Sequence, residues 1–179
     1  MVMMLKPQDT LLALKYWSLR RSGQQVTVRE LAEQLSLSAG EVSKSAKRLL
    51  VAHLLVEREG IYYAEANGLA EWLCYGVRYA FPAQALGYGR GMATAWNCPL
   101  VNTEIVPPQP AAIWAVSGGE QEGVIVEPIV SGVPLAAAND ALLYQALALV
   151  DAVRLGKPRE LAIARAHLKS LITGRLLET

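Results

Sequence analysis

Two capping boxes, eleven residues apart, constrain the fold of this chain more than any other feature of its sequence. Thr27 is followed three residues later by Glu30, and Ser38 is followed three residues later by Glu41. In such a box the hydroxyl and the carboxylate each satisfy a backbone N–H group at the start of a helix. The pattern therefore predicts a short helix, VRELAEQL, then a tight turn, and a second helix that begins after Ser38.

The second of these helices is predicted to have one apolar and one polar side. Four apolar residues recur at i, i+4, i+7 and i+8, which indicates a buried stripe on a helix running to about Ala52: Val42, Ala46, Leu49 and Leu50. The other side carries hydroxyl and basic groups: Ser43, Lys44, Lys47 and Arg48. We therefore expect this helix to pack on its neighbour while it exposes cationic side chains.

The flanking segments complete a characteristic order of elements. Residues 8–21 have a broad apolar face and are followed by Gly23, which predicts a helix that ends there. Residues 54–64 predict a hairpin with its turn at Glu59-Gly60. A helix, a helix–turn–helix and a hairpin in this order predict a winged helix-turn-helix. We place this DNA-binding domain at residues 1–66.

The rest of the chain, residues 67–179, is predicted to combine helices with a small β element, so the fold class is α+β. The expected elements are a helix at 67–81 ended by Pro82, an irregular Gly- and Pro-rich stretch at 82–112, strands at 113–116 and 124–126 around a turn at Gly118-Gly119, and helices at about 139–155 and 158–173. We expect this region to dimerise, bind a partner or sense a ligand.

The charge is distributed unevenly along the chain. Residues 1–64 contain nine Lys/Arg and six Asp/Glu, a net charge of +3, whereas residues 65–179 contain eight and ten, a net charge of −2. The basic excess therefore coincides with the predicted DNA-binding domain. The whole chain carries only +1, so it is not a polybasic binder of nucleic acid throughout.

The apolar content predicts a subunit interface. Hydrophobic residues make up 53% of the chain and charged residues only 18%, which exceeds what the predicted domain core needs. Three helices are candidates for a homodimer interface: 8–21, 67–81 and 139–155. No apolar stretch reaches the eighteen residues expected of a membrane span, and neither cysteine suggests a disulfide scaffold. We expect a cytoplasmic protein with no membrane association.

The stretch LSLSAGEVSKSAKRLLVAHLLVEREGIYY resembles the MarR-like winged-helix regulators. The matching residues are Leu37-Ser38, Val42-Ser43-Lys44, Leu49-Leu50, Leu54-Leu55 and Arg58. Two features depart from that pattern. His53 stands where such proteins often have a glycine in the left-handed conformation, and Arg58 is flanked by Glu57 and Glu59, which disfavours deep insertion of the hairpin into a minor groove.

The resemblance implies a sequence-specific transcriptional regulator, a repressor or autoregulator, that binds double-stranded DNA as a homodimer. By this resemblance the major groove would be faced by Ser38, Ser43, Lys44 and Lys47. Three arginines would meet phosphates: Arg48, Arg58 and, from the preceding helix, Arg29. Phosphate contacts supply affinity, whereas contacts to base edges supply specificity.

Two other classes of function remain open from the sequence. The chain could be an interaction module, such as an antitoxin or a defence-system regulator, whose C-terminal half binds a protein partner. It could also be an enzyme with a site in residues 82–135, although we expect no enzyme, because no catalytic set stands out. Residues 87–98 match neither glycine pattern of nucleotide-binding loops. Arg90, with Tyr88 and Trp96 nearby, suggests at most an anion site.

The cysteines and histidines do not predict a metal centre or cofactor. Cys74 and Cys98 have no ligand-like spacing relative to His53 or His167. Cys74 lies on an apolar helix face and is predicted to be a small core residue. Cys98 could sense oxidants only if its thiol were exposed and prone to ionise.

Overall fold

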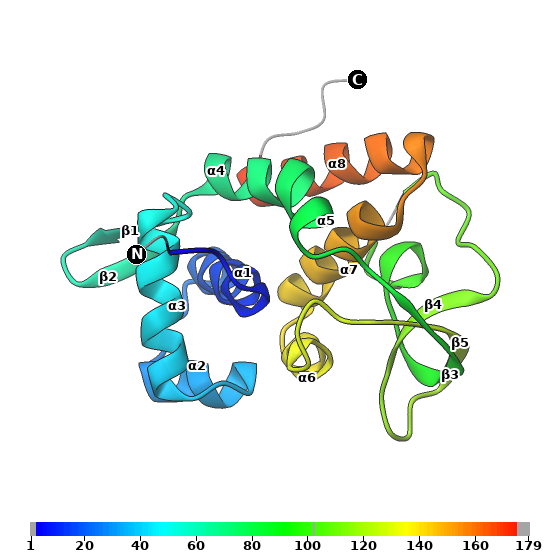
Figure 1. Ribbon diagram of the computed structural model, residues 1–179, viewed down its shortest axis with the longest axis horizontal. Coiled ribbons are helices and arrows are strands. Elements are labelled where there is room, and N and C mark those ends of the chain that lie inside the picture. The colour runs from blue at the N-terminus through cyan, green and yellow to red at the C-terminus, as the bar shows by residue number, and fades with distance from the viewer. Residues whose placement is uncertain (1–2, 102, 175–179) are drawn as a thin grey trace.

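The computed structural model describes residues 3–101 and 103–174 and shows an α+β chain (Figure 1). The N-terminal elements are α1 (Pro7–Ser22), α2 (Val28–Leu35), α3 (Ala39–Val51) and the hairpin strands β1 (Leu55–Arg58) and β2 (Ile61–Ala64). Figure 1 shows these elements at one end of the molecule and a small β structure at the other, with helices between them.

The remaining elements cover residues 66–173. In chain order they are α4 (Ala66–Glu71), a π-helical turn (Trp72–Gly76), α5 (Val77–Ala80), β3 (Ala85–Ala93), a 3-10 turn (Ala95–Asn97), β4 (Ala111–Ala115), β5 (Gln121–Val126), α6 (Val133–Ala138), α7 (Ala141–Leu155) and α8 (Pro158–Thr173). The helices predicted at 139–155 and 158–173 are confirmed, and the short helix α6 is an addition. No helix among the described residues is long and apolar enough to cross a bilayer.

The caps fix the helix ends largely as the sequence predicts. Thr27 accepts the N–H of Glu30 and the Glu30 carboxylate accepts the N–H of Thr27, so the first capping box is confirmed. Ser38 likewise accepts the N–H of Glu41. The second box is nevertheless only half formed, because the Glu41 carboxylate instead accepts a hydrogen bond from Gln8 of α1, at 2.9 Å.

The end of α3 leads directly into the hairpin. His53 adopts the left-handed conformation with φ 58°, and the N–H of Leu54 donates to the carbonyl of Leu49 at 2.9 Å, as in a Schellman ending. His53 therefore adopts a left-handed backbone conformation that a glycine would adopt more easily. The predicted turn at Glu59-Gly60 is also confirmed: both residues have positive φ, which is the type I′ geometry favoured in two-residue hairpins.

The hairpin is held against α1 by aromatic contacts. Tyr16 of α1 meets Tyr62 of β2 edge to face, with ring centroids 5.8 Å apart. Burial, together with the nearby Tyr62, raises the pKa of Tyr16 to about 12. Arg20, in the last turn of α1, lies over the ring of Tyr63 at 5.3 Å from its centroid. The base of the hairpin is thus fixed to the central helix of the N-terminal half.

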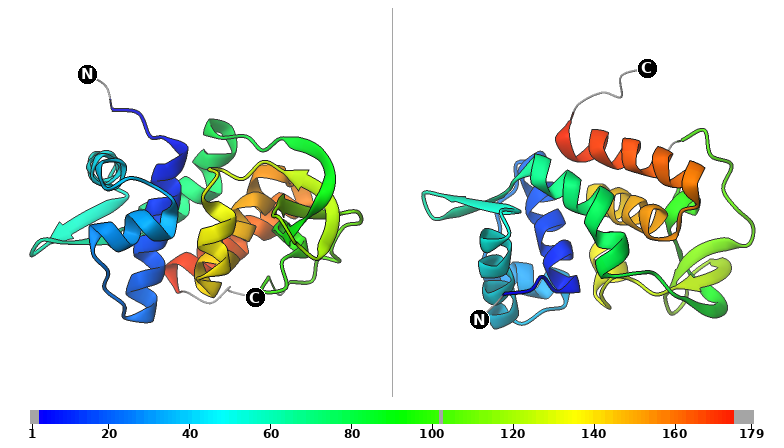
Figure 2. Two further views of the ribbon diagram at one scale, coloured as in Figure 1. Left: turned by 90° about the horizontal axis from the view of Figure 1, so that it is seen from below. Right: turned by 45° about the horizontal axis from the view of Figure 1, so that its top comes forward.

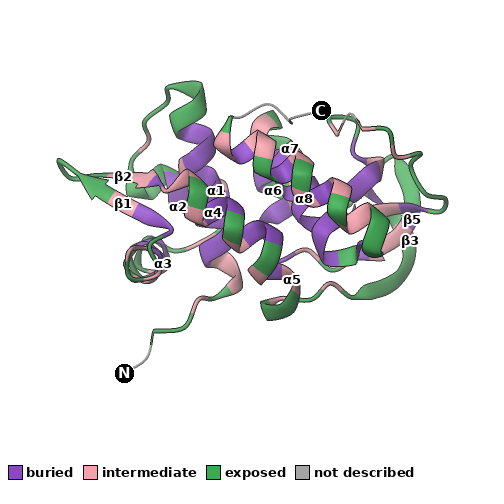
Figure 3. Cartoon of the chain, turned by 90° about the horizontal axis from the view of Figure 1, so that it is seen from above, coloured by how far each residue is buried: buried purple, intermediate pink, exposed green. Residues whose placement is uncertain are grey.

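Helices α1 and α7 lie inside the monomer and form the centre of its hydrophobic core. Leu11, Leu12 and Leu14 of α1 are fully buried, and α7 is buried along almost its whole length, from Leu143 to Arg154. Figure 2 shows α7 lying between α1 and the small β structure, and Figure 3 shows the buried residues concentrated along the middle of the molecule. One continuous hydrophobic cluster includes residues from both α1 and α7.

This burial changes the prediction for a homodimer interface. Two of the three predicted interface helices, α1 and α7, already use their apolar residues inside the monomer. The third predicted helix, 67–81, is observed as α4, the π-helical turn and α5, and it exposes two aromatic side chains, Tyr75 and Tyr79. The apolar excess of the sequence therefore fills an internal core at α1 and α7.

The small β structure is a closed three-stranded barrel. Strand β3 pairs antiparallel with both β4 and β5, and β4 pairs parallel with β5. The expectation of an irregular stretch at 82–112 is wrong for Ala85–Ala93, where β3 lies. One of its glycines is required by close approach: a Cβ at Gly91 would lie 1.8 Å from the carbonyl oxygen of Trp114. Gly91 therefore marks a point of tight strand packing.

A buried acid joins the barrel to α7. Asp151 accepts hydrogen bonds from Thr94 at 2.8 Å, from the indole of Trp114 at 2.7 Å and from Arg154 at 2.7 Å. Burial raises the pKa of Asp151 above its usual value, and these three partners oppose that shift. Arg154 also donates to the carbonyl oxygens of Phe81 and Glu127, so it ties the barrel's flanking segments to the same helix.

We predict that Gly123→Ala destabilises the barrel, because its Cβ would lie 2.0 Å from the carbonyl oxygen of Ala111. Overpacking of this kind costs about 1–3 kcal/mol of unfolding free energy, measurable by urea unfolding followed by tryptophan fluorescence. The matched change Gly40→Ala in α3 has its nearest neighbour at 3.9 Å and should be neutral or stabilise by up to about 1 kcal/mol. Equal effects of the two substitutions would contradict the close strand packing.

Candidate nucleic-acid interface

Helix α3 has the two-sided character that its sequence predicts. Val42, Ala46 and Leu49 are buried against the rest of the chain, whereas Ser43, Lys44 and Lys47 are exposed. Figure 2 shows α3 at the margin of the molecule, where its outer side is not covered by another element. The outer side therefore presents a hydroxyl and two ammonium groups to solvent.

The two lysines differ from the acids at the starts of α2 and α3, which are engaged by other side chains. Glu30 is bound to Thr27, which lowers the pKa of Glu30 through backbone and side-chain hydrogen bonds, and Glu41 is bound to Gln8. In residues 3–101 and 103–174, neither Lys44 nor Lys47 forms an ion pair. Their charge is consequently available to an external anion.

The charge of Arg48, in contrast, is already bound within the chain. Its guanidinium binds Asp9 at two atoms, Nε to Oδ2 at 2.7 Å and Nη2 to Oδ1 at 2.6 Å. The side chains of Arg48 and Asp9 are 10% and 1% exposed. The hydrogen bond to Asp9 is the main cause that raises the pKa of Arg48. The prediction that Arg48 meets a phosphate is therefore revised, because this residue joins α3 to α1.

Asp9 is the centre of that junction. Besides the two bonds from Arg48, its carboxylate accepts the hydroxyl of Ser45 at 2.5 Å and the backbone N–H of Lys6 at 2.7 Å. Ser45 and Arg48 lie one position after Lys44 and Lys47 in the helix. Because successive helical residues are rotated by about 100°, anchoring Ser45 and Arg48 to α1 directs the lysines away from it.

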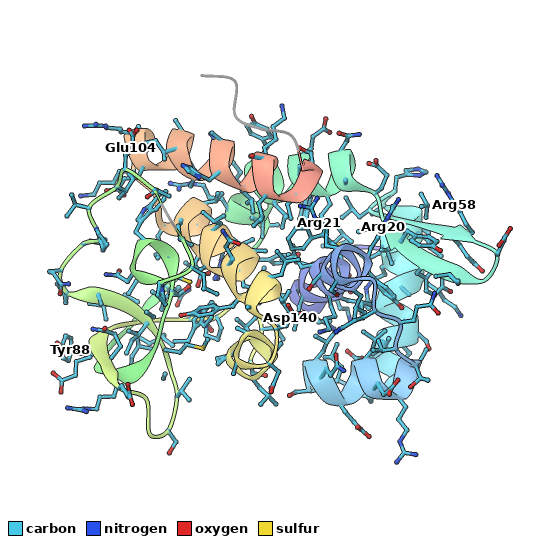
Figure 4. The ribbon with its side chains drawn as sticks, turned by 180° about the vertical axis from the view of Figure 1, so that it is seen from behind. Arg20, Arg21, Arg58, Tyr88, Glu104 and Asp140 are labelled. Carbon is cyan, nitrogen blue, oxygen red and sulfur yellow. The ribbon has the colours of Figure 1, made fainter. Side chains whose placement is uncertain are left out.

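The other predicted contacts occupy the neighbouring elements. Ser38 lies at the start of α3, where its hydroxyl caps the helix and is exposed. Arg29 of α2 is highly exposed and bonds only loosely to Glu33, at 3.4 Å. Arg58 is exposed on the hairpin, as Figure 4 shows, between the exposed acids Glu57 and Glu59. These side chains come from α2, α3 and the hairpin, the elements that the sequence groups into one module.

Arg20 is a basic residue of this region that sequence reasoning did not select. It projects from the last turn of α1 beside the hairpin (Figure 4), over Tyr63. The only sequence signal was the pair Arg20-Arg21 before Gly23, which is also an ordinary way to end a helix. Its position against the hairpin became apparent only from the packing of α1 on β2.

The structure does not bring together the residues of the anion site or of the redox site that the sequence suggests as alternatives. Arg90 pairs with Glu122, and Trp96 is buried while Tyr88 is exposed, so these residues do not form a common anion site. Cys74 is a buried core residue as predicted, and burial raises the pKa of its thiol to about 11. Cys98 is also buried with a raised pKa, which opposes formation of the reactive thiolate.

Comparisons with models of protein families, with curated proteins and with solved structures found no match. Among the described residues, one cleft lies between α1, α2 and β2, and another lies between α1, α2 and the start of α7. Neither is lined by residues 82–135, where a catalytic site was considered.

We predict that Arg48→Ala and Lys47→Ala have very different effects on stability. Removing Arg48 leaves the Asp9 carboxylate buried without its charged partner, which typically costs about 3–5 kcal/mol. Removing the exposed Lys47 should change the free energy of unfolding by no more than about 0.5 kcal/mol. Chemical denaturation of both variants measures the difference. Similar small losses would indicate that the Arg48–Asp9 pair does not anchor α3.

Proposed function

We propose that this chain is a sequence-specific DNA-binding regulator of the MarR-like winged helix-turn-helix type. The observation that carries the proposal is the pair Lys44 and Lys47, exposed and without ion-pair partners among the described residues, on the outer side of a helix anchored from behind. In this proposal α3 is the recognition helix, α2 braces it, and the hairpin is the wing.

The dimensions and the chemistry of α3 support this reading. An α-helix with its side chains is about 10–12 Å across, which suits a major groove about 12 Å wide. Lys44 and Lys47 would approach the phosphates and base edges from one side of the helix. Ser38 and Ser43 would supply hydroxyl groups that can donate to or accept from either partner. Arg29 would add a phosphate contact from α2.

The wing has a smaller part in the proposal. It is a four-residue strand pair with a tight turn, and Arg58 is its basic group. The adjacent Glu57 and Glu59 would be repelled by phosphates, so Arg58 is assigned to the backbone of the duplex instead of the floor of the minor groove. Arg48 is left out of the set, because its guanidinium is already bound to Asp9.

The regulator would act as a homodimer that represses transcription or controls its own gene. Two copies read two half-sites, because the symmetry of an operator mirrors that of the protein. With α1 and α7 buried in the monomer, the exposed Tyr75 and Tyr79 make the π-helical turn and α5 the remaining candidate among the three predicted helices. Sedimentation equilibrium should then give twice the 19.4 kDa of one chain, and a purely monomeric mass would contradict this part of the proposal.

We predict that the double charge reversal Lys44→Glu and Lys47→Glu abolishes specific DNA binding without unfolding the chain. Fluorescence anisotropy with DNA from upstream of the chain's own gene measures the affinity across salt concentrations. Each lost phosphate contact should also reduce the log–log salt slope by about one unit.

The control is the double reversal Lys157→Glu and Arg159→Glu, at the exposed start of α8. It changes the net charge equally but lies away from α3 (Figure 1). It should retain most of the affinity. Equal loss in both double variants would mean that only net charge matters, and unchanged affinity of the Lys44/Lys47 variant would remove α3 from the interface.

A protein partner is a second candidate, favoured by exposed apolar side chains at the far end of the molecule. Leu86, Tyr88 and Val106 are more than half exposed, on or near the barrel. This reading corresponds to an antitoxin or defence-system regulator that binds its partner through the C-terminal half. Stoichiometric co-purification of another protein with the untagged chain, lost on Tyr88→Glu, would support it over simple autoregulation.

A further inference from the structure

The side chain of Arg20 is held against the hairpin while its charge is unused. Arg20 lies in the last turn of α1, is exposed, and places its guanidinium over the ring of Tyr63 of β2, 5.3 Å from the centroid. In the part of the chain that the structure describes, it forms no ion pair and no side-chain hydrogen bond. A guanidinium packed on an aromatic ring keeps N–H donors at its outer edge. Arg20 therefore presents a positioned cation with unused donors to solvent.

The other arginine of the hairpin region, Arg58, is less suited to bind an anion. It is exposed between Glu57 and Glu59, whose carboxylates repel a phosphate. The sequence neighbours of Arg20, in contrast, are a leucine and a second arginine. The contact with Tyr63 also restricts the side chain of Arg20 in advance, so less rotamer entropy is lost when it binds a partner. Of the two arginines, Arg20 is therefore the better phosphate ligand.

The hairpin lies between α3 and Arg20. Strand β1 contacts α3, whereas β2 contacts α1, in part through the ring contact of Tyr16 and Tyr62. Figure 4 shows Arg20 at the base of the hairpin and Arg58 farther out along it. In a duplex the major groove adjoins a minor groove about 6 Å wide, with a phosphate strand along each edge. With α3 in the major groove and the hairpin over the minor groove, Arg20 would meet the phosphate strand beyond the hairpin.

A cleft without acidic residues opens beside Arg20. It lies between α1, α2 and β2 and has a volume of about 360 Å³. Among the described residues that line it are Arg20 and the exposed Gln24 and Gln25, and none is an aspartate or a glutamate. Glutamine side chains bind phosphates in protein–DNA interfaces, as arginine does. Arg20 and Arg21 also offset the partial negative charge at the C-terminal end of α1. The surroundings of Arg20 therefore favour an anion.

We propose that Arg20 binds a phosphate of the DNA backbone and that Tyr63 is the residue that positions it. The inference rests on the proposed DNA-binding function and adds to it a contact from α1, on the side of the hairpin away from α3. Because a phosphate is the same at every base pair, this contact supplies affinity without sequence preference. The hairpin would thus be flanked by DNA-binding cations on both sides, from α3 and from α1.

Fluorescence anisotropy across salt concentrations tests the proposal with two duplexes of equal length, one from upstream of the chain's own gene and one of unrelated sequence. Arg20→Ala should weaken binding to both duplexes about tenfold, as expected for one charge-assisted hydrogen bond, and should reduce the log–log salt slope by about one unit. The double reversal Lys44→Glu and Lys47→Glu should instead remove the preference for the upstream duplex, because these lysines face base edges.

Arg21→Ala is the matched control. Arg21 is the next residue, carries the same charge and is also exposed. Its guanidinium lies against the end of α8, where a Cβ at Gly174 would be 2.7 Å from Nη1, and Figure 4 shows it on the α8 side of Arg20. The Arg21 variant should retain most of the affinity. Equal losses in the Arg20 and Arg21 variants would show an effect of net charge alone and would remove the assignment.

The positioning role of Tyr63 has its own readout. Tyr63→Phe keeps the ring and should retain the affinity, whereas Tyr63→Leu should weaken binding about threefold, as expected for an exposed cation–π contact. Combined with Arg20→Ala, Tyr63→Leu should cause no further loss, and a further threefold loss would contradict this role.

The outcomes separate this inference from the function on which it rests. Unchanged affinity and salt slope in Arg20→Ala, while the Lys44/Lys47 variant loses specific binding, would overturn this inference alone. No binding of either duplex by the unsubstituted chain would overturn the proposed function and this inference together.

Discussion

The orientation of α3 depends on one buried carboxylate. Asp9 lies in the first turn of α1, and without partners its charge would be too costly to bury. Three of its donors come from Ser45 and Arg48 of α3, so the start of α1 can be buried only when α3 docks with one particular face inward. That requirement also determines which residues remain outside. A largely buried charged pair therefore determines which side chains of α3 form the surface.

Short-range chemistry explains what the sequence could predict. The helix starts at Thr27 and Ser38, the hairpin turn at Glu59-Gly60 and the exposed lysines of α3 all follow from residues within a few positions of one another. The pairing of Arg48 with Asp9 could not be predicted for the opposite reason, because the two residues are 39 positions apart. An arginine on a polar helix face looks the same in sequence whether it faces water or a buried acid.

The barrel illustrates the same limit for backbone structure. A segment rich in glycine was predicted to be irregular, because glycine is flexible and packs weakly in strands. In the folded chain Gly91 of this segment, like Gly123 of β5, lies where strands come too close for any side chain. Whether a glycine-rich segment forms a loop or a closely packed strand depends on whether another strand, distant in the sequence, packs against it. The ion pair of Lys15 with Asp140 was missed likewise, since the two residues are 125 positions apart.

The continuous core has a consequence for how this chain could be divided or recombined. Trp17 of α1 donates to the carbonyl of Ile172 at 3.0 Å, and Lys15 binds Asp140, so the first helix finds essential partners in the last third of the sequence. A fragment truncated after residue 66 would expose the apolar side of α1 to water. Exchanging the N-terminal part between proteins would likewise require the exchange of α7 and α8. These long-range contacts therefore disfavour transfer of the N-terminal part as an independent domain.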